Sequence, residues 1–124
     1  MKVSGFLFSV ALLTLWALIV ARWAGAAAWD NWQPPAWWAR QAACIHKYET
    51  RGLPAGSWAA WHDTRNPQSR GGMQFIPSTW RSVGGHGDPA KASKQEQLYR
   101  AWILYTRSGH SWRQWTTSTL CGLR

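Results

Sequence analysis

The sequence predicts a small, mainly α-helical domain that is closed by one disulfide bond. Two stretches show helical hydrophobic spacing, no stretch shows the alternation of a long β-strand, and two cysteines lie far apart in the chain. The length of 124 residues is enough for one domain. The formal net charge is +9, with 12 Trp and only 5 Asp plus Glu. Such abundant aromatic residues argue against a disordered chain.

The N-terminal segment has the layout of a secretory signal peptide. Residues 5–21 are almost entirely apolar, Lys2 precedes them, and small residues at 24–28 fit a cleavage site. The alternative is an uncleaved membrane anchor, because about 17 to 25 apolar residues can span a bilayer. We favour a signal peptide over residues 1–28. Both alternatives export the rest of the chain to the cell wall, and membrane contact is expected only if this segment is retained.

The first helix is predicted for residues 36–50, after a linker over residues 29–35. Gly52 and Pro54 end the helical pattern. Five residues recur on one face at helical spacing, and four of them are apolar or aromatic: Trp37, Gln41, Cys44, Ile45 and Tyr48.

A Gly- and Pro-rich loop over residues 51–71 separates this helix from two further helices, and a short β-hairpin is compatible with this region. A short helix follows Pro77. Ser93 and Glu96 form a capping box that starts the last helix, which Gly109 ends. Its apolar face consists of Leu98, Ala101, Trp102 and Tyr105.

Cys44 and Cys121 predict a disulfide, because paired cysteines in a small exported domain are typically oxidised. Closing so long a loop contributes about 4 kcal/mol in the chain-entropy picture. The alternative is a metal site, but the histidines are scattered and no CxxC or HExxH spacing occurs. No phosphate-binding glycine loop occurs either. We therefore expect no metal and no cofactor.

Glu49 is the candidate catalytic residue. Turn or capping roles can be proposed for most of the other carboxylates, and Asp63 is a loop residue suited to an Asx turn or to positioning a partner. Glu49 lies in the last turn of the first helix, close to Trp58 and Trp61 of the loop, where burial and the helix dipole both raise its pKa. A carboxyl that stays protonated near neutral pH can act as a general acid on a glycosidic oxygen. The alternative is a surface glutamate neutralised by nearby basic residues.

Residues 71–80, GGMQFIPSTW, contain candidate ligand contacts. Two glycines allow a close approach of the backbone to a ligand, and the amide of Gln74 can bind sugar hydroxyl and N-acetyl groups. The alternative is a loop-to-helix junction that packs on the core.

Three motifs occur in order: CIHKYETRG at residues 44–52, GGMQFIPSTWRSVGG at 71–85 and GDPAKASKQEQLYRAWILY at 87–105. Together with the cysteine pair, they resemble the resuscitation-promoting-factor and transglycosylase-like domains. The resemblance covers residues 44–122 and extends to the family's disulfide. It implies a lysozyme-like fold that cleaves peptidoglycan at the β-1,4 bond between N-acetylmuramic acid and N-acetylglucosamine.

The resemblance also implies site residues. Glu49 matches the family's catalytic glutamate, although Thr-Arg-Gly follows it where the family usually has Ser-Gly-Gly. Gly72, Met73 and Gln74 match the family's substrate-cleft box. Apart from the resemblance, we expect Trp58, Trp61 and Trp80 near the cleft because indole faces stack on sugar rings, and Trp102 in the core. Asp63 and Thr64 of the loop are further candidate substrate contacts.

The resemblance favours a lytic transglycosylase over a hydrolase. A two-carboxylate hydrolase needs a second acid, and Asp63 is the only loop candidate. With one glutamate, the 6-hydroxyl of the sugar itself attacks and forms a 1,6-anhydro ring. The alternative class is a non-catalytic, basic, Trp-rich module that binds the cell wall or a membrane surface. Export and the absence of a known motif argue against nucleic-acid binding. We expect a monomer that binds peptidoglycan glycan strands.

Overall fold

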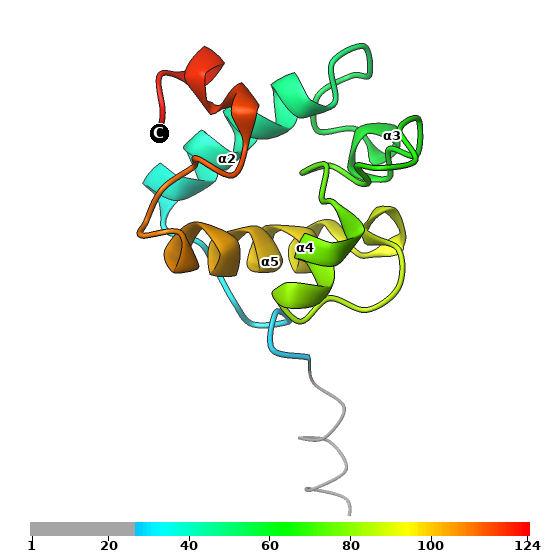
Figure 1. Ribbon diagram of the computed structural model, residues 1–124, viewed down its shortest axis with the longest axis horizontal. Coiled ribbons are helices and arrows are strands. Elements are labelled where there is room, and N and C mark those ends of the chain that lie inside the picture. The colour runs from blue at the N-terminus through cyan, green and yellow to red at the C-terminus, as the bar shows by residue number, and fades with distance from the viewer. Residues whose placement is uncertain (1–26) are drawn as a thin grey trace, which may run out of the picture. The chain divides into compact units, whose positions relative to one another are not determined.

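The computed structural model describes residues 27–124, so most of the predicted signal peptide or anchor lies outside the described residues. Their elements, shown in Figure 1, are α2 (Ala36–Glu49), α3 (Trp58–Trp61), α4 (Pro77–Ser82), η1 (Pro89–Lys91), α5 (Lys94–Arg107) and η2 (Thr116–Cys121). The predicted mainly α-helical class is confirmed. Within residues 27–124, β pairing is limited to one bridge between Arg70 and Phe75, and no helix there is long and apolar enough to cross a membrane.

The first predicted helix is confirmed as α2, but its buried face differs from the prediction by one position. Trp38, Ala42 and Ile45 are fully buried, whereas Trp37 is 46% exposed. Two adjacent tryptophans allow two registers of the apolar stripe, and local spacing does not choose between them. Tertiary packing determines that Trp38 is the buried one of the two, because its ring stacks on Trp112 with centroids 5.1 Å apart.

Aromatic side chains from three parts of the chain form the core around Trp38. Its ring meets Trp102 and Tyr105 of α5 at centroid distances of 5.4 and 6.2 Å. Trp112 comes from the segment after α5, and Trp32 packs edge-on at 6.1 Å from the segment before α2. Much of the tryptophan content therefore serves burial, because indole rings remove a large apolar area from water.

The last predicted helix is confirmed as α5, and the hydroxyl of Ser93 accepts the N–H of Glu96 as the capping box predicts. The sequence pattern did not indicate Gln97, which is fully buried on this helix. Its amide oxygen accepts the N–H of Gly72 at 2.7 Å, and its amide nitrogen donates to the carbonyl of Trp61 at 2.8 Å. Gln97 thereby attaches α5 to the end of α3 and to the loop in front of α4.

The predicted disulfide between Cys44 and Cys121 is confirmed and fastens η2 to α2. The two cysteines are 77 positions apart in sequence, and their Cα atoms are 6.1 Å apart. In Figure 1, η2 lies beside α2, and these two elements contact each other extensively. The C-terminal segment therefore lies next to the helix that carries Glu49.

His46 is buried and holds α2 against two loops. The N–H at its Nδ1 donates to the carbonyl of Gly72 at 2.7 Å, and its Nε2 accepts the N–H of Gly56 at 3.0 Å. An accepting Nε2 requires the neutral ring, with its proton on Nδ1. The ring also stacks on Trp61 with centroids 4.1 Å apart. Burial lowers the pKa of His46. This effect is larger than that of the hydrogen bond to Gly72, which raises the pKa.

We predict that loss of the disulfide destabilises the domain by about 4 kcal/mol, because the unfolded chain regains the entropy of a long open loop. Denaturant unfolding with and without a reducing agent measures this difference. The doubly substituted chain, Cys44→Ser with Cys121→Ser, is the control and is expected to be insensitive to the reductant. Equal stability of oxidised and reduced wild-type protein would contradict the prediction.

We predict that acidification from pH 7.5 to pH 5 destabilises the wild-type protein more than the His46→Gln variant. The folded-state pKa of His46 lies below its ordinary value of 6.5, so the unfolded chain binds more protons. The stability from neutral His46 is therefore complete above pH 6.5 and declines as the pH falls below it. Thermal unfolding across this range tests the prediction, since the other titrating groups are present in both proteins.

An NMR titration of the His46 ring in the wild-type protein provides a test without a substitution. A titration midpoint at or above 6.5 would contradict the prediction.

Candidate active site

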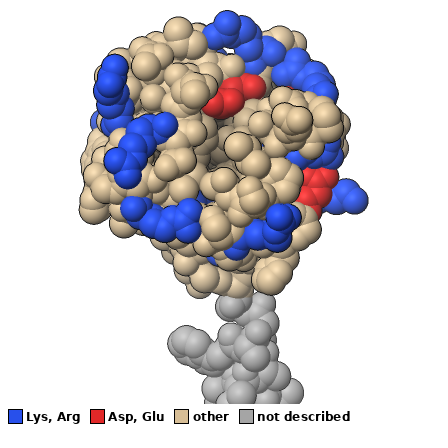
Figure 2. All heavy atoms as spheres, in the orientation of Figure 1, with Lys and Arg blue, Asp and Glu red and all other residues tan. Residues whose placement is uncertain are grey.

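Glu49, the last residue of α2, lies at a surface cavity of about 210 Å³. Figure 2 shows basic side chains around a hollow on the face in view. The walls come from the segment before α4, from α4 and α5, and from the C-terminal segment. Beside Glu49, the lining residues are Ser69, Gln74, Phe75, Ile76, Thr79, Leu104, Gln114, Trp115 and Thr116.

Burial of the Glu49 carboxyl raises its pKa above the ordinary value of 4.5. The hydroxyl of Thr117 donates to Glu49 Oε1 at 2.8 Å and lowers the pKa, but burial is the larger effect. The pKa of Glu49 is raised, as the sequence predicts, but the aromatic residues around the carboxyl differ from those expected. Phe75 and Trp115 share the cavity with Glu49, and Trp58 and Trp61 do not line it.

Within residues 31–124, the other three carboxylates are held elsewhere, and none of them lines this cavity. Hydrogen bonds from arginine side chains hold the pKa of Asp63 and the pKa of Asp88 below their usual range. The partners are Arg65 for Asp63, Arg70 for Asp88 and Arg100 for Glu96. Asp30 precedes this range, and its carboxylate accepts the N–H of Ala27. Glu49 is therefore the carboxyl that is placed to meet a ligand in the cavity.

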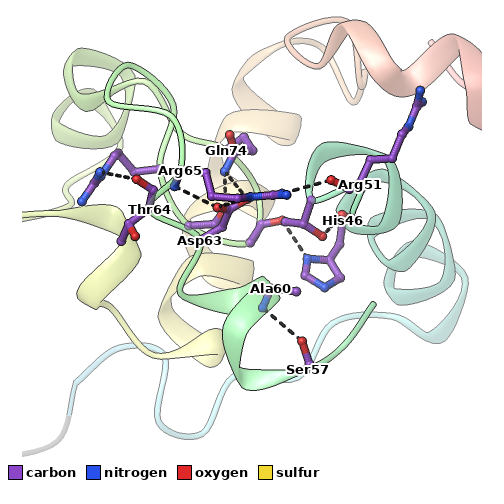
Figure 3. A network of polar contacts seen from close by, with 12 residues as sticks. His46, Arg51, Ser57, Ala60, Asp63, Thr64, Arg65 and Gln74 are labelled. Atoms are coloured by element: carbon purple, nitrogen blue, oxygen red, sulfur yellow. Dashed lines mark hydrogen bonds and ion pairs between the residues drawn. The ribbon is translucent and has the colours of Figure 1, made fainter. Parts of the chain in front are cut away.

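Asp63 is the centre of a polar network (Figure 3), and Gln74 connects this network to the cavity wall. It is buried, forms an ion pair with Arg65 at 2.9 Å, and lies 3.5 Å from the amide nitrogen of Gln74. Arg65 also donates to the carbonyl of Arg51, just after α2. Gln74 donates to the carbonyl of Gly71 at 2.8 Å and has a left-handed backbone with φ 50°. These contacts hold Gln74 in the cavity wall, and Asp63, which was predicted as a substrate contact, contacts Gln74 but does not line the cavity.

Gln74 is the one predicted substrate contact that the structure places in the cavity wall together with Glu49. Gly72 and Met73 are buried, and their backbone positions the segment. A Cβ at Gly72 would lie 2.3 Å from the Trp61 ring, so a larger residue does not fit there. The carbonyl of Met73 accepts the indole N–H of Trp115 at 2.9 Å.

The three tryptophans predicted at the cleft lie in different environments. Trp80 is fully buried in the core. Trp61 lines a second cavity, of about 330 Å³, which it shares with His46 but not with Glu49. Trp58 is 77% exposed on α3, where its ring meets His62 at 4.4 Å. Thr64 is also exposed, and it does not line the cavity of Glu49.

The C-terminal side of the cavity was not predicted from the sequence. It contributes Gln114, Trp115 and Thr116, and Thr117 of this segment donates a hydrogen bond to Glu49. These residues follow α5 in sequence and have no helical spacing of their own. The cysteine pair was the available signal. Cys44 is five residues before Glu49, and Cys121 is four residues after Thr117, so the disulfide brings the two segments together.

Comparison with known proteins places the chain among bacterial relatives. It is 39% identical over 75 residues to the resuscitation-promoting factor Rpf of Micrococcus luteus. These 75 residues cover 60% of this chain and 32% of that protein. It is 49% identical over 43 residues to the resuscitation-promoting factor RpfC of Mycobacterium tuberculosis, covering 35% of this chain and 29% of that protein. The chain thus spans about a third of the length of these curated relatives.

The model of the transglycosylase-like domain family matches residues 54–118, a range that begins just after Glu49. This range includes Gln74, Trp115 and Thr117, and it covers just over half of the 124 residues. The helical architecture with one disulfide is consistent with a small lysozyme-like domain. The chain therefore belongs to the transglycosylase-like domain family.

Proposed function

We propose that this chain cleaves the glycan strands of peptidoglycan and that Glu49 is its general acid. The observation that carries the proposal is the isolation of Glu49 as the one carboxyl at the cavity, with a pKa raised by burial. A protonated carboxyl can give its proton to a glycosidic oxygen as the bond breaks. Membership of the transglycosylase-like family supports this class of reaction, and the motif resemblance supports peptidoglycan as the substrate.

The proposed reaction breaks the β-1,4 bond between N-acetylmuramic acid and N-acetylglucosamine. Glu49 gives its proton to the bridging oxygen while positive charge develops at C1 and the ring oxygen. The resulting carboxylate then accepts the proton of the muramic 6-hydroxyl, and the oxygen of that hydroxyl bonds to C1. A 1,6-anhydro ring closes, no water is consumed, and Glu49 is protonated again.

The positions of the other carboxylates favour this route over hydrolysis by two carboxylates. In such hydrolases a second carboxylate acts as nucleophile or as base for water. Asp63 is the loop candidate for that role, but it is buried and its carboxylate forms an ion pair with Arg65. The 6-hydroxyl of the substrate can replace the missing second group.

The charge of the chain fits an anionic polymer such as the cell wall. Residues 29–124 hold 12 Lys plus Arg and 5 Asp plus Glu, a formal net charge of +7, and an excess of positive charge speeds association with a negatively charged partner. We also propose that the chain acts outside the cell as a monomer, after residues 1–28 have directed its export.

We predict that Glu49→Gln lowers the rate of peptidoglycan cleavage at least about a hundredfold, because the amide cannot supply the proton. The measurement is digestion of purified peptidoglycan, with mass spectrometry of the released fragments. Anhydro ends are expected in the wild-type digest, whereas reducing ends would show that the enzyme is a hydrolase.

Glu96→Gln is the matched control, because it makes the same chemical change at a carboxyl that pairs with Arg100 on α5. This variant is expected to release the wild-type fragments at a rate close to that of the wild type. If Glu49→Gln and the wild-type protein digest peptidoglycan equally, or if neither digests it, Glu49 is not the general acid of a peptidoglycan-cleaving enzyme.

We predict that kcat/KM falls as the pH rises through the pKa of Glu49, because the general acid is active when protonated. Burial raises this pKa, so the fall is centred above 4.5. Initial rates of fragment release between pH 4 and pH 8 check the prediction. A fall centred at or below pH 4.5 would contradict the prediction, because it would show that the pKa of the acid is not raised.

A further inference from the structure

The hydroxyl of Thr117 donates a hydrogen bond to Glu49 Oε1 at 2.8 Å. Thr117 is half-buried in η2, and the disulfide between Cys44 and Cys121 fastens that element to α2. The bond therefore joins the proposed general acid to a segment that is anchored independently. Its neighbour Thr119 uses its hydroxyl differently, since it lies 3.3 Å from the carbonyl of Thr116 and is exposed.

We propose that Thr117 is a positioning residue, which holds Glu49 by Oε1 so that Oε2 carries the acidic proton and faces the substrate. This inference rests on the proposed function of Glu49. The terminal torsion of a glutamate side chain has broad, roughly two-fold preferences, so an unrestrained carboxyl exchanges its two oxygens by rotation. The hydroxyl hydrogen of Thr117 points at a lone pair of Oε1. A carboxyl proton on the same oxygen would be repelled by this hydrogen. The proton of the acid therefore resides on Oε2.

The same bond serves the second half of the reaction. A hydroxyl that donates to a carboxylate stabilises its charged form, and this opposes the effect of burial on Glu49. Burial favours the state in which Glu49 gives a proton, and Thr117 favours the state in which Glu49 receives one. The two effects together allow one residue to act first as an acid and then as a base.

Glu49 is the titratable group of this cavity. The lining residues contributed by α4, by α5 and by the segments on either side carry amide, hydroxyl or apolar side chains. The basic residues nearest to Glu49 in sequence are Lys47 and Arg51, and both lie over the ring of Tyr48. A shift in the pH profile after a change at Thr117 therefore reports on Glu49.

The test compares Thr117→Val, which keeps the shape but loses the hydroxyl, with Thr117→Ser, which keeps the hydroxyl. For Thr117→Val we expect a kcat about tenfold lower, the factor that corresponds to about 1.4 kcal/mol, with little change in KM. The fall of kcat/KM with pH moves to higher pH, because the lost bond stabilised the carboxylate. Thr117→Ser restores both properties, and Thr119→Val, the control in the same element, leaves both unchanged.

A ¹³C NMR titration of the Glu49 carboxyl in the wild type and in Thr117→Val measures the same shift without substrate. Thr117→Ala also removes the hydroxyl, and it replaces Thr117→Val in both measurements if that variant does not fold. A lower melting temperature with an unchanged pH profile and an unchanged titration would overturn the inference and leave Thr117 a structural role. Inactivity of the wild-type protein, or full activity of Glu49→Gln, would instead reject the proposed function.

Discussion

The hydrogen bonds of the buried His46 imidazole hold the end of α2 against two loops, one of which leads into the wall of the cavity. One ring nitrogen binds the carbonyl of Gly72 and the other binds the N–H of Gly56. Glu49 lies nearly one helical turn after His46, and Gln74 lies two residues after Gly72. The His46 ring therefore helps to position both the carboxyl of Glu49 and the amide of Gln74 at the cavity. The peptide at Gly72 is held at its N–H as well, by Gln97 of α5.

Much of the fold could be predicted from the sequence, because its signals are local. The spacing and capping of residues 36–50 and of the helix after Ser93 depend on near neighbours. Each of the two cysteines had only the other as a possible partner within the chain. The register of Trp38 could not be predicted, because the choice between it and Trp37 depends on rings more than sixty residues away in sequence. Hydrophobic spacing decides that a face is buried, and tertiary packing decides which side chain fills the centre.

The candidate site shows the same division. Glu49 could be selected because acidic residues are few, and Gln74 because its amide can bind sugar hydroxyl and N-acetyl groups. The positions of Trp58 and Trp61 could not be predicted, since an indole serves equally as a core residue and as a sugar-binding surface. Thr117 carried no signal of its own, because one hydroxyl among several in the C-terminal segment acquires its role through the path of the chain.

The disulfide between Cys44 and Cys121 makes the geometry of the site sensitive to redox conditions. Thr117, whose hydroxyl contacts Glu49, lies four residues before Cys121, and the disulfide fastens this segment to α2. Disulfides form in oxidising compartments and stay reduced in the cytosol of most organisms. The covalent link between η2 and α2 is therefore stable in an oxidising environment and lost in a reducing one. Reduction leaves the contact between Thr117 and Glu49 to non-covalent packing alone, so the position of the Glu49 carboxyl depends on the redox state of its surroundings.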